Sequence, residues 1–196
     1  PKSRRAANLP ARGIMFSLHP EQELDRIMAA LASGGAVGLL LIEAEPLARI
    51  ERRYGGPAHQ QAMEGLVNLV REVALESVPS ENLLVSEDRQ RGSILAFIFQ
   101  PRSDSRFYTT RIRSLAERVT RQIYRQGRRI VYPYLRDPLE LPVGVAIALH
   151  NPTINSERQI MHAIDHARAD AKLEAGLRLR RAARQVLELI LASDLS

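Results

Sequence analysis

The uninterrupted apolar run at residues 36–42 constrains the fold more than any other segment. It is too short for a typical buried helix and lacks the alternation of a half-exposed strand, so it predicts a strand covered on both faces. The strand ends at Glu43 and Glu45, and Pro46 then favours the start of a short helix that ends at Tyr54-Gly55. Two acids are therefore expected where a covered strand turns into a helix.

Helical and extended patterns alternate along the rest of the chain. Apolar residues at i, i+3, i+4 and i+7 predict helices, for which we expect the segments 19–35, 63–74, 112–123, 160–171 and 177–191. Short β-rich runs predict strands, for which we expect the segments 82–86, 93–99, 129–134 and 143–149. This order predicts an α/β or α+β domain with a mixed central sheet and helices packed on it.

The same patterns divide the chain into four parts. Residues 1–18 are basic and lack periodicity, which is typical of a linker. A leading helix at 19–35 is followed by the main domain at 36–176. A single domain does not need the helical stretch at 177–196 for its core. We expect that stretch to connect to a following domain or to pair with a partner.

The charge balance raises the question of nucleic-acid binding. The 196 residues include 28 Lys and Arg against 22 Asp and Glu, which gives a formal net charge of +6 and a pI near 10.3. The basic residues are nearly all Arg and are scattered along the chain, and aromatic residues make up only 5% of it. Since bases would find few stacking partners, we favour a solvated basic surface over a nucleic-acid site.

Composition and motifs exclude other classes of protein. Cys is absent, which removes disulfides and thiolate zinc sites, and a cytoplasmic location is the simplest interpretation. No apolar run approaches the ~20 residues of a membrane span, and neither a Walker loop nor a Gly-x-Ser-x-Gly motif is present. His162, Asp165 and His166 share one helical face, for which we favour a surface cluster over a metal site.

Several weak motifs, in a fixed order, resemble those of the GGDEF domain of diguanylate cyclases. They are Glu43-Ala44-Glu45, Tyr54-Gly55, Arg91-Gly92-Ser93-Ile94-Leu95-Ala96, Val143-Gly144-Val145-Ala146 and Asp165-x-Ala167…Ala171-Lys172. The resemblance covers about residues 36–176. It implies the palm-like fold of that family and a place in a bacterial cyclic di-GMP signalling protein.

The resemblance also implies where a nucleotide pocket would lie. It places the acids of the family's first strand on Glu43 and Glu45, and the Asn that recognises guanine on Glu51. Arg91 and Gly92 stand at the two glycines of the signature hairpin. These positions outline a vestigial pocket whose residues depart from the family pattern.

The acids of the signature hairpin are replaced. Ser93 and Ile94 stand at these positions, and neither can supply a carboxylate. Two-metal phosphoryl transfer requires carboxylates on both sides of the substrate, and Mg²⁺ requires hard oxygen ligands. We therefore expect a degenerate domain without catalytic residues, metal or cofactor. The alternative is a divergent metal-dependent nucleotidyl cyclase or transferase that uses Glu43 and Glu45.

The remaining matched positions bear on ligand binding. Asn82 and Val85 stand at the Arg and Asp of the family's product-inhibition site, so we expect no product binding there. Lys172 matches a lysine that contacts phosphates in that family, and Arg89 matches a basic residue just before the hairpin. With Arg91 they would suit GTP as an allosteric ligand, but we favour a structural ion pair between Glu43 and Lys172.

The resemblance and the missing acids together predict a regulatory role. We expect a non-catalytic domain that acts in dimerisation, signal relay or nucleotide sensing. The expected partner is a second copy of the chain, another protein or a neighbouring domain, for which the family suggests the EAL type. No membrane partner is expected.

Overall fold

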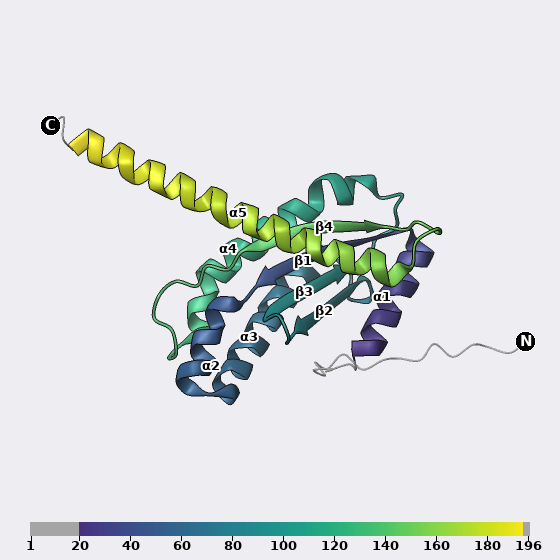
Figure 1. Cartoon of the computed structure of the whole chain (residues 1–196), viewed down its shortest axis with the longest axis horizontal. Helices are drawn as coiled ribbons and strands as arrows, with labels where there is room; N and C mark the ends of the chain where they lie inside the picture. The colour runs from purple at the N-terminus through teal and green to yellow at the C-terminus, as the bar shows by residue number, and fades with distance from the viewer. Residues whose placement is uncertain (1–19, 194–196) are drawn as a thin grey trace, which may run out of the picture.

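The structure is a computed structural model that describes residues 20–193, and the side chains of 22–185 (Figure 1). The predicted linker at 1–18 lies outside the described residues. The helices are α1 (Pro20–Gly34), α2 (Ala48–Tyr54), α3 (Gly56–Leu75), α4 (Ile112–Val131) and α5 (Ser156–Ser193). The strands are β1 (Ala36–Glu43), β2 (Leu83–Asp88), β3 (Ser93–Ile98) and β4 (Val143–Leu149). Short 3-10 turns at Glu45–Leu47 and Ser80–Asn82 and a π-helical turn at Phe107–Arg111 complete the elements.

The four strands form one sheet in the order β2-β3-β1-β4. The central strand β1 pairs with β3 on one side and β4 on the other, so that Leu40 lies opposite both Ala96 and Val145. The predicted α+β class is confirmed, and β1 is buried as expected. The expected mixed sheet is wrong for the described strands, because all three pairings are antiparallel. A hydrophobic pattern identifies strands but not their directions.

Helices cover both faces of the sheet. Alternate residues of β1 point to opposite sides, so that Leu40 enters the core with α2, α3 and α4, while Leu39 enters the core with α1 and α5. Met63 and Leu66 of α3 are fully buried in the first core. Figure 1 shows α5 crossing in front of the sheet, with α3 behind it. The core that contains Leu39 holds α5 against this face of the sheet.

α5 lies unusually close to β4. A Cβ atom added at Gly144 would lie 1.8 Å from the carbonyl oxygen of Ala167 and 2.5 Å from the amide nitrogen of Ala171. Only glycine permits this approach, and Ala167 and Ala171 are fully buried there. The contact fixes the height of α5 above the sheet and the position of its side chains.

The strand predicted at 129–134 is wrong. α4 continues through this segment to Val131, which is fully buried, and Ile130 packs against Gly65 of α3. The helix ends at Tyr132, whose ψ of 139° is extended. A residue before proline disfavours the helical region, so Pro133 sets this boundary. The short apolar run fitted a helix end as well as a strand.

The helices expected at 160–171 and 177–191 are parts of one continuous helix of 38 residues, α5. Its later turns extend away from the sheet in Figure 1, and the side chains of Leu173 and Leu179 are exposed. The role of this extension as a connector stays a prediction. Among the described helices, none combines the length and apolar character needed to cross a membrane.

Candidate functional site

Three polar residues form one row across the sheet where β1 ends. Glu43 lies opposite Ser93 in the β1–β3 pairing, and Ser93 lies opposite Asp88 in the β2–β3 pairing. Ser93 is fully buried, and the two flanking carboxylates are partly buried. The antiparallel register therefore brings together two acids that are 45 positions apart in the sequence.

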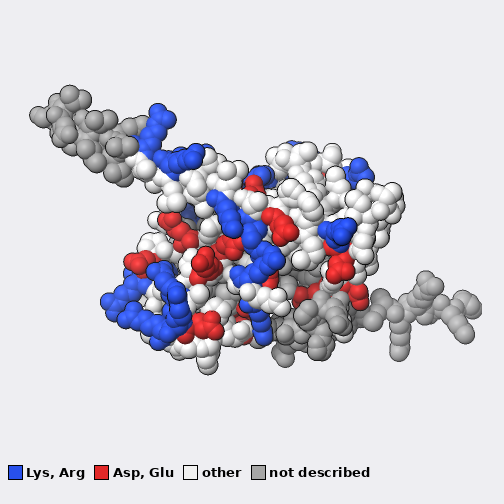
Figure 2. Space-filling view, viewed as in Figure 1, with Lys and Arg blue, Asp and Glu red and all other residues white. Residues whose placement is uncertain are grey.

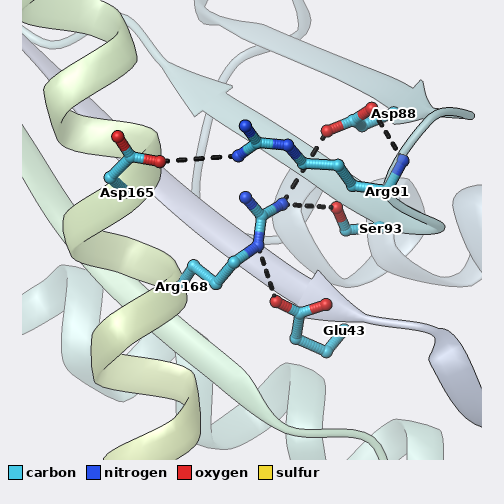
Figure 3. Close-up of polar contacts among 6 residues, drawn as sticks. All are labelled: Glu43, Asp88, Arg91, Ser93, Asp165 and Arg168. Carbon is cyan, nitrogen blue, oxygen red and sulfur yellow. Dashed lines mark hydrogen bonds and ion pairs between the residues drawn. The ribbon is translucent and has the colours of Figure 1, made fainter.

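Arg168 of α5 connects all three residues of this row (Figure 3). Its Nε donates to Oε1 of Glu43 at 2.9 Å, and its Nη2 donates to Oγ of Ser93 at 3.1 Å. The same Nη2 lies 3.8 Å from Oδ2 of Asp88. Only 14% of the Arg168 side chain is exposed, against 17% for Glu43 and 22% for Asp88. We name these four residues the Arg168 cluster.

The guanidinium in this cluster serves as the counter-ion of two partly buried carboxylates. Burying one charge without a partner is costly, and hydrogen bonds to ionised groups are stronger than neutral ones. The Nη1 of Arg168 is buried and finds no hydrogen-bond partner among the described residues. The guanidinium therefore lies between α5, which carries it, and the sheet, which supplies all of these partners.

The hairpin between β2 and β3 is fastened beside this cluster. The backbone N–H of Arg91 donates to Oδ1 of Asp88 at 3.3 Å, and its guanidinium pairs with Asp165 of α5 at 3.5 Å. Gly92 has a φ of +59°, which favours glycine at the turn. Its carbonyl accepts a hydrogen bond from the N–H of Ala44 at 3.0 Å. The hairpin thus contacts both the end of β1 and α5.

Comparison with known proteins identifies the fold. No protein-family model matches the chain, and no curated protein sequence does. Among solved structures, the GGDEF domain of DgcB from Caulobacter crescentus, determined in complex with c-di-GMP, has a TM-score of 0.51 at 13% identity. The match covers 86% of this chain and 94% of that one. An EAL/GGDEF domain protein from M. capsulatus has a TM-score of 0.51 at 14% identity, covering 80% and 94%. The chain has a GGDEF-like fold.

Within this GGDEF-like domain, the predicted partner of Glu43 is wrong. Glu43 does form an ion pair, but with Arg168 and not with Lys172. Lys172 lies one helical turn further along α5, is exposed, and forms no ion pair with a described residue. The close contact of α5 at Gly144 places the earlier turn over the row.

Sequence reasoning missed two of the residues in the Arg168 cluster. Asp88 lies beyond the strand predicted at 82–86, yet it is the last residue of β2. Arg168 lies between the buried residues Ala167 and Ala171, which is an unusual place for a charged side chain. That position was a usable signal, although only the tertiary fold shows what the side chain meets.

The other pocket residues of the GGDEF-like domain do not converge on this cluster. Glu45 and Glu51 are exposed, and neither forms a hydrogen bond or ion pair with Glu43 among the described residues. Arg89 pairs with Glu87 at 3.7 Å and is largely exposed. The structure therefore brings Glu43 and the hairpin together, whereas Glu45, Glu51 and Arg89 lie outside the Arg168 cluster.

Asn82 and Val85, the two positions matched to the family's product-inhibition site, take part in the packing and backbone hydrogen bonding of the fold. Val85 is buried in the core that also contains α3. The carbonyl of Asn82 accepts a hydrogen bond from the N–H of Phe99 at 2.8 Å, next to the start of β2. Neither residue carries a charge that could hold a phosphate.

The histidine pair on α5 lies near the hairpin contact. The rings of His162 and His166 are 5.0 Å apart, and Asp165 between them pairs with Arg91. Within the described part of the chain, no group of three or more His, Asp or Glu residues is arranged to hold a metal ion. Near the hairpin, the cation that pairs with two carboxylates is the guanidinium of Arg168, which lies beside Glu43 and Asp88.

Proposed function

We propose that this chain is a catalytically inactive GGDEF-like domain that acts as a regulatory or interaction module in bacterial cyclic di-GMP signalling. The observation that carries the proposal is the guanidinium of Arg168 among Glu43, Asp88 and Ser93. The location that we propose for the module is the cytoplasm.

The Arg168 cluster opposes metal binding for two reasons. Mg²⁺ needs hard oxygen ligands in nearly octahedral geometry, and Ser93 stands where the resemblance expects a carboxylate. The Oε1 of Glu43 already accepts a hydrogen bond from the guanidinium of Arg168 at 2.9 Å. A divalent cation would have to displace Arg168 against like-charge repulsion. Phosphoryl transfer depends on such metal ions to stabilise the developing charge.

Turnover of nucleotides tests the inactive state. The purified protein is incubated with labelled GTP and, separately, the other nucleoside triphosphates, with Mg²⁺ or Mn²⁺, beside an active diguanylate cyclase as a positive control. We expect no cyclic dinucleotide and no pyrophosphate release. Product formed by this chain and abolished by Glu43→Gln would instead establish the divergent cyclase or transferase that uses Glu43 and Glu45.

Restoring carboxylates tests the role of Arg168 directly. Substituting Arg168→Ser together with Ser93→Asp removes the internal cation and adds an acid to the row. We expect the double variant to bind Mn²⁺ in calorimetric titration, while the parent chain does not. Equal Mn²⁺ binding by both proteins would show that Arg168 does not exclude metal.

The regulatory half of the proposal is supported by α5. One helix carries Arg168 and Asp165 against the site and continues well beyond the sheet, so a shift at either end is transmitted along a rigid element. Arg91, half exposed at the hairpin, is the residue best placed to meet a phosphate. Calorimetric titration with GTP, with and without Mg²⁺, tests nucleotide sensing. GTP binding that is lost in Arg91→Ala would show that Arg91 contacts the nucleotide.

Dimerisation is the remaining part of the proposal. We expect size-exclusion chromatography with light scattering to show a homodimer. The alternative is that the domain pairs with a neighbouring domain of the same polypeptide, such as one of the EAL type. A monomer at the highest attainable concentration would favour the neighbouring domain over a second copy.

A further inference from the structure

Arginines are arranged in a row along the solvent-facing side of α4. The α4 arginine stripe, as we name it, begins at Arg111 in the turn just before α4 and continues along the helix with Arg118, Arg121, Arg125, Arg128 and Arg129. Arg111, Arg118 and Arg125 recur every seven residues, an interval of two helical turns that returns to the same side of the helix. The opposite side of α4 carries Ala116 and Ile123 into the core. Packing of that apolar side therefore fixes the stripe toward solvent.

Most of this positive charge has no counter-ion. Arg118 pairs with Glu76 and donates to Oγ of Ser77 at 2.6 Å. The other five arginines are exposed and form no ion pair with a described residue, and Glu117 is the one acid in α4. By contrast, acidic and basic side chains lie interspersed on the face with α5 in front (Figure 2). Like charges repeated along one side of a helix repel one another.

A small pocket lies at the first turn of the stripe. Its volume is about 300 Å³, and it is lined by Ser77, Phe107, Arg111, Ser114, Leu115 and Arg118. Phe107 and Leu115 supply apolar surface, whereas Arg111 supplies a cation that forms no ion pair within the described part of the chain. Such a lining suits a side chain with an aliphatic stem and a carboxylate end, which is the structure of Glu.

We propose that the α4 arginine stripe binds an acidic α-helix of a partner protein, with carboxylates repeated every seven residues. This inference rests on the proposed role as an interaction module and names the chemistry of its partner. Seven residues rise about 10.5 Å on any α-helix, so carboxylates at that interval meet successive arginines of the stripe. The guanidinium fork matches a carboxylate with two parallel hydrogen bonds.

The surroundings of the stripe favour such a helix over other polyanions. Glu76 lies beside Arg118, and Glu117 adjoins it in sequence. These acids would repel a continuous phosphate backbone along the whole turn, whereas an acidic helix places a single carboxylate there and its other carboxylates at Arg111 and Arg125. Tyr124 is the one exposed large apolar residue of α4 among those described, so the helix lacks the apolar face that a membrane-surface helix inserts.

Fluorescence anisotropy with designed peptides tests the inference. The probe is a labelled alanine-based helical peptide of about four heptads with Glu repeated every seven residues, and its control has the same composition with the Glu positions scattered. We expect the heptad peptide to bind more tightly than the scattered one. The double substitution Arg111→Glu and Arg125→Glu should weaken its binding about tenfold or more.

A matched variant controls for the change in net charge. Arg158→Glu with Arg178→Glu alters two exposed arginines on α5, away from the stripe, and should leave affinity within about twofold. Far-ultraviolet circular dichroism checks that each variant is folded. If the Glu variant unfolds, Arg125→Gln with Arg129→Gln replaces it and should also weaken binding.

Three outcomes would overturn the inference. These are equal affinity for both peptides, no loss of affinity in the α4 variant, and tighter binding of duplex DNA or phosphatidylserine vesicles that the α4 variant loses. The last outcome would assign the stripe to nucleic acid or to a membrane surface. The assay contains no nucleotide, so its failure leaves the inactive-domain proposal standing, and cyclic dinucleotide synthesis would contradict only that proposal.

Discussion

At the scale of single residues, Arg168 decides the character of the site at the end of β1. Its guanidinium joins Glu43, Ser93 and Asp88, which come from three adjacent strands. The alternative to this arrangement is two partly buried carboxylates without a nearby cation. Removing one member of a partly buried ion pair leaves the other charge desolvated and unpaired.

We expect Arg168→Met to lower the free energy of unfolding by about 2–3 kcal/mol, because it leaves Glu43 and Asp88 without their cation. Urea denaturation measures the change. Adding Glu43→Gln should cost less than the sum of the single substitutions, since the two residues act together. Lys172→Met, an exposed change one turn along α5, should stay within about 0.5 kcal/mol. Equal losses from both Met variants would deny the special role of Arg168.

Tyr108 is a second residue whose surroundings predict a measurable effect. Burial raises the pKa of its hydroxyl to about 12, and the hydroxyl donates a hydrogen bond to the carbonyl of Gln100. The folded state therefore holds this proton more firmly than the unfolded state, whose pKa is near 10. The stabilisation is complete below pH 10 and is lost as the pH rises from 10 toward 12.

We therefore expect Tyr108→Phe to lose less stability than the parent chain between pH 10 and 12. Urea denaturation across that range provides the comparison. Tyr124→Phe, at a tyrosine that is 53% exposed, is the control and should follow the parent curve. Parallel curves for all three proteins would refute the assignment.

At the scale of elements, the contact of α5 with β4 positions the site. Gly144 allows the backbone of α5 to approach the strand, and this brings Arg168 over the row on β1, β2 and β3. Asp170 strengthens the contact, since its Oδ2 accepts the N–H of Val145 at 2.8 Å. The same carboxylate accepts two hydrogen bonds from Arg113 of α4, at 3.0 and 3.1 Å. A helix on one face of the sheet is thereby tied to a helix on the other.

We expect Gly144→Ala to cost about 3 kcal/mol or more, because the added methyl group meets helix backbone that cannot move without lifting α5. Gly176→Ala is the matched control on α5, where an added Cβ has no neighbour within 4 Å. That substitution should raise stability by up to about 1 kcal/mol through helix propensity. Urea denaturation of both variants tests the pair, and a neutral Gly144→Ala would contradict the close approach.

At the scale of the whole molecule, the two cores do not require the far end of α5. Ala171 is the last residue of that helix in the buried core among those described, and Leu173 and Leu179 are exposed. We therefore expect truncation after Gly176 to leave the midpoint of thermal unfolding nearly unchanged, as measured by circular dichroism. A large drop would show that the later turns of α5 stabilise the domain.

The amino-acid sequence determined the fold class and most of the elements. The apolar run at 36–42 could only be a covered strand, and the order of motifs indicated a GGDEF-like fold. These features are local, because each depends on residues that are near one another in the chain. The strand expected at 129–134 failed for the same reason, since a short apolar run at a helix end has the same local pattern.

Tertiary structure alone decided which side chains share the site. Glu43, Asp88 and Arg168 are far apart in sequence, and strand register and the height of α5 bring them together. The sequence offered Lys172 as the partner of Glu43, and only the packing of α5 on Gly144 selects Arg168 one turn earlier. One turn of a helix is a small change in sequence position. It determines which charge reaches a buried carboxylate, because desolvated charges require a partner in direct contact.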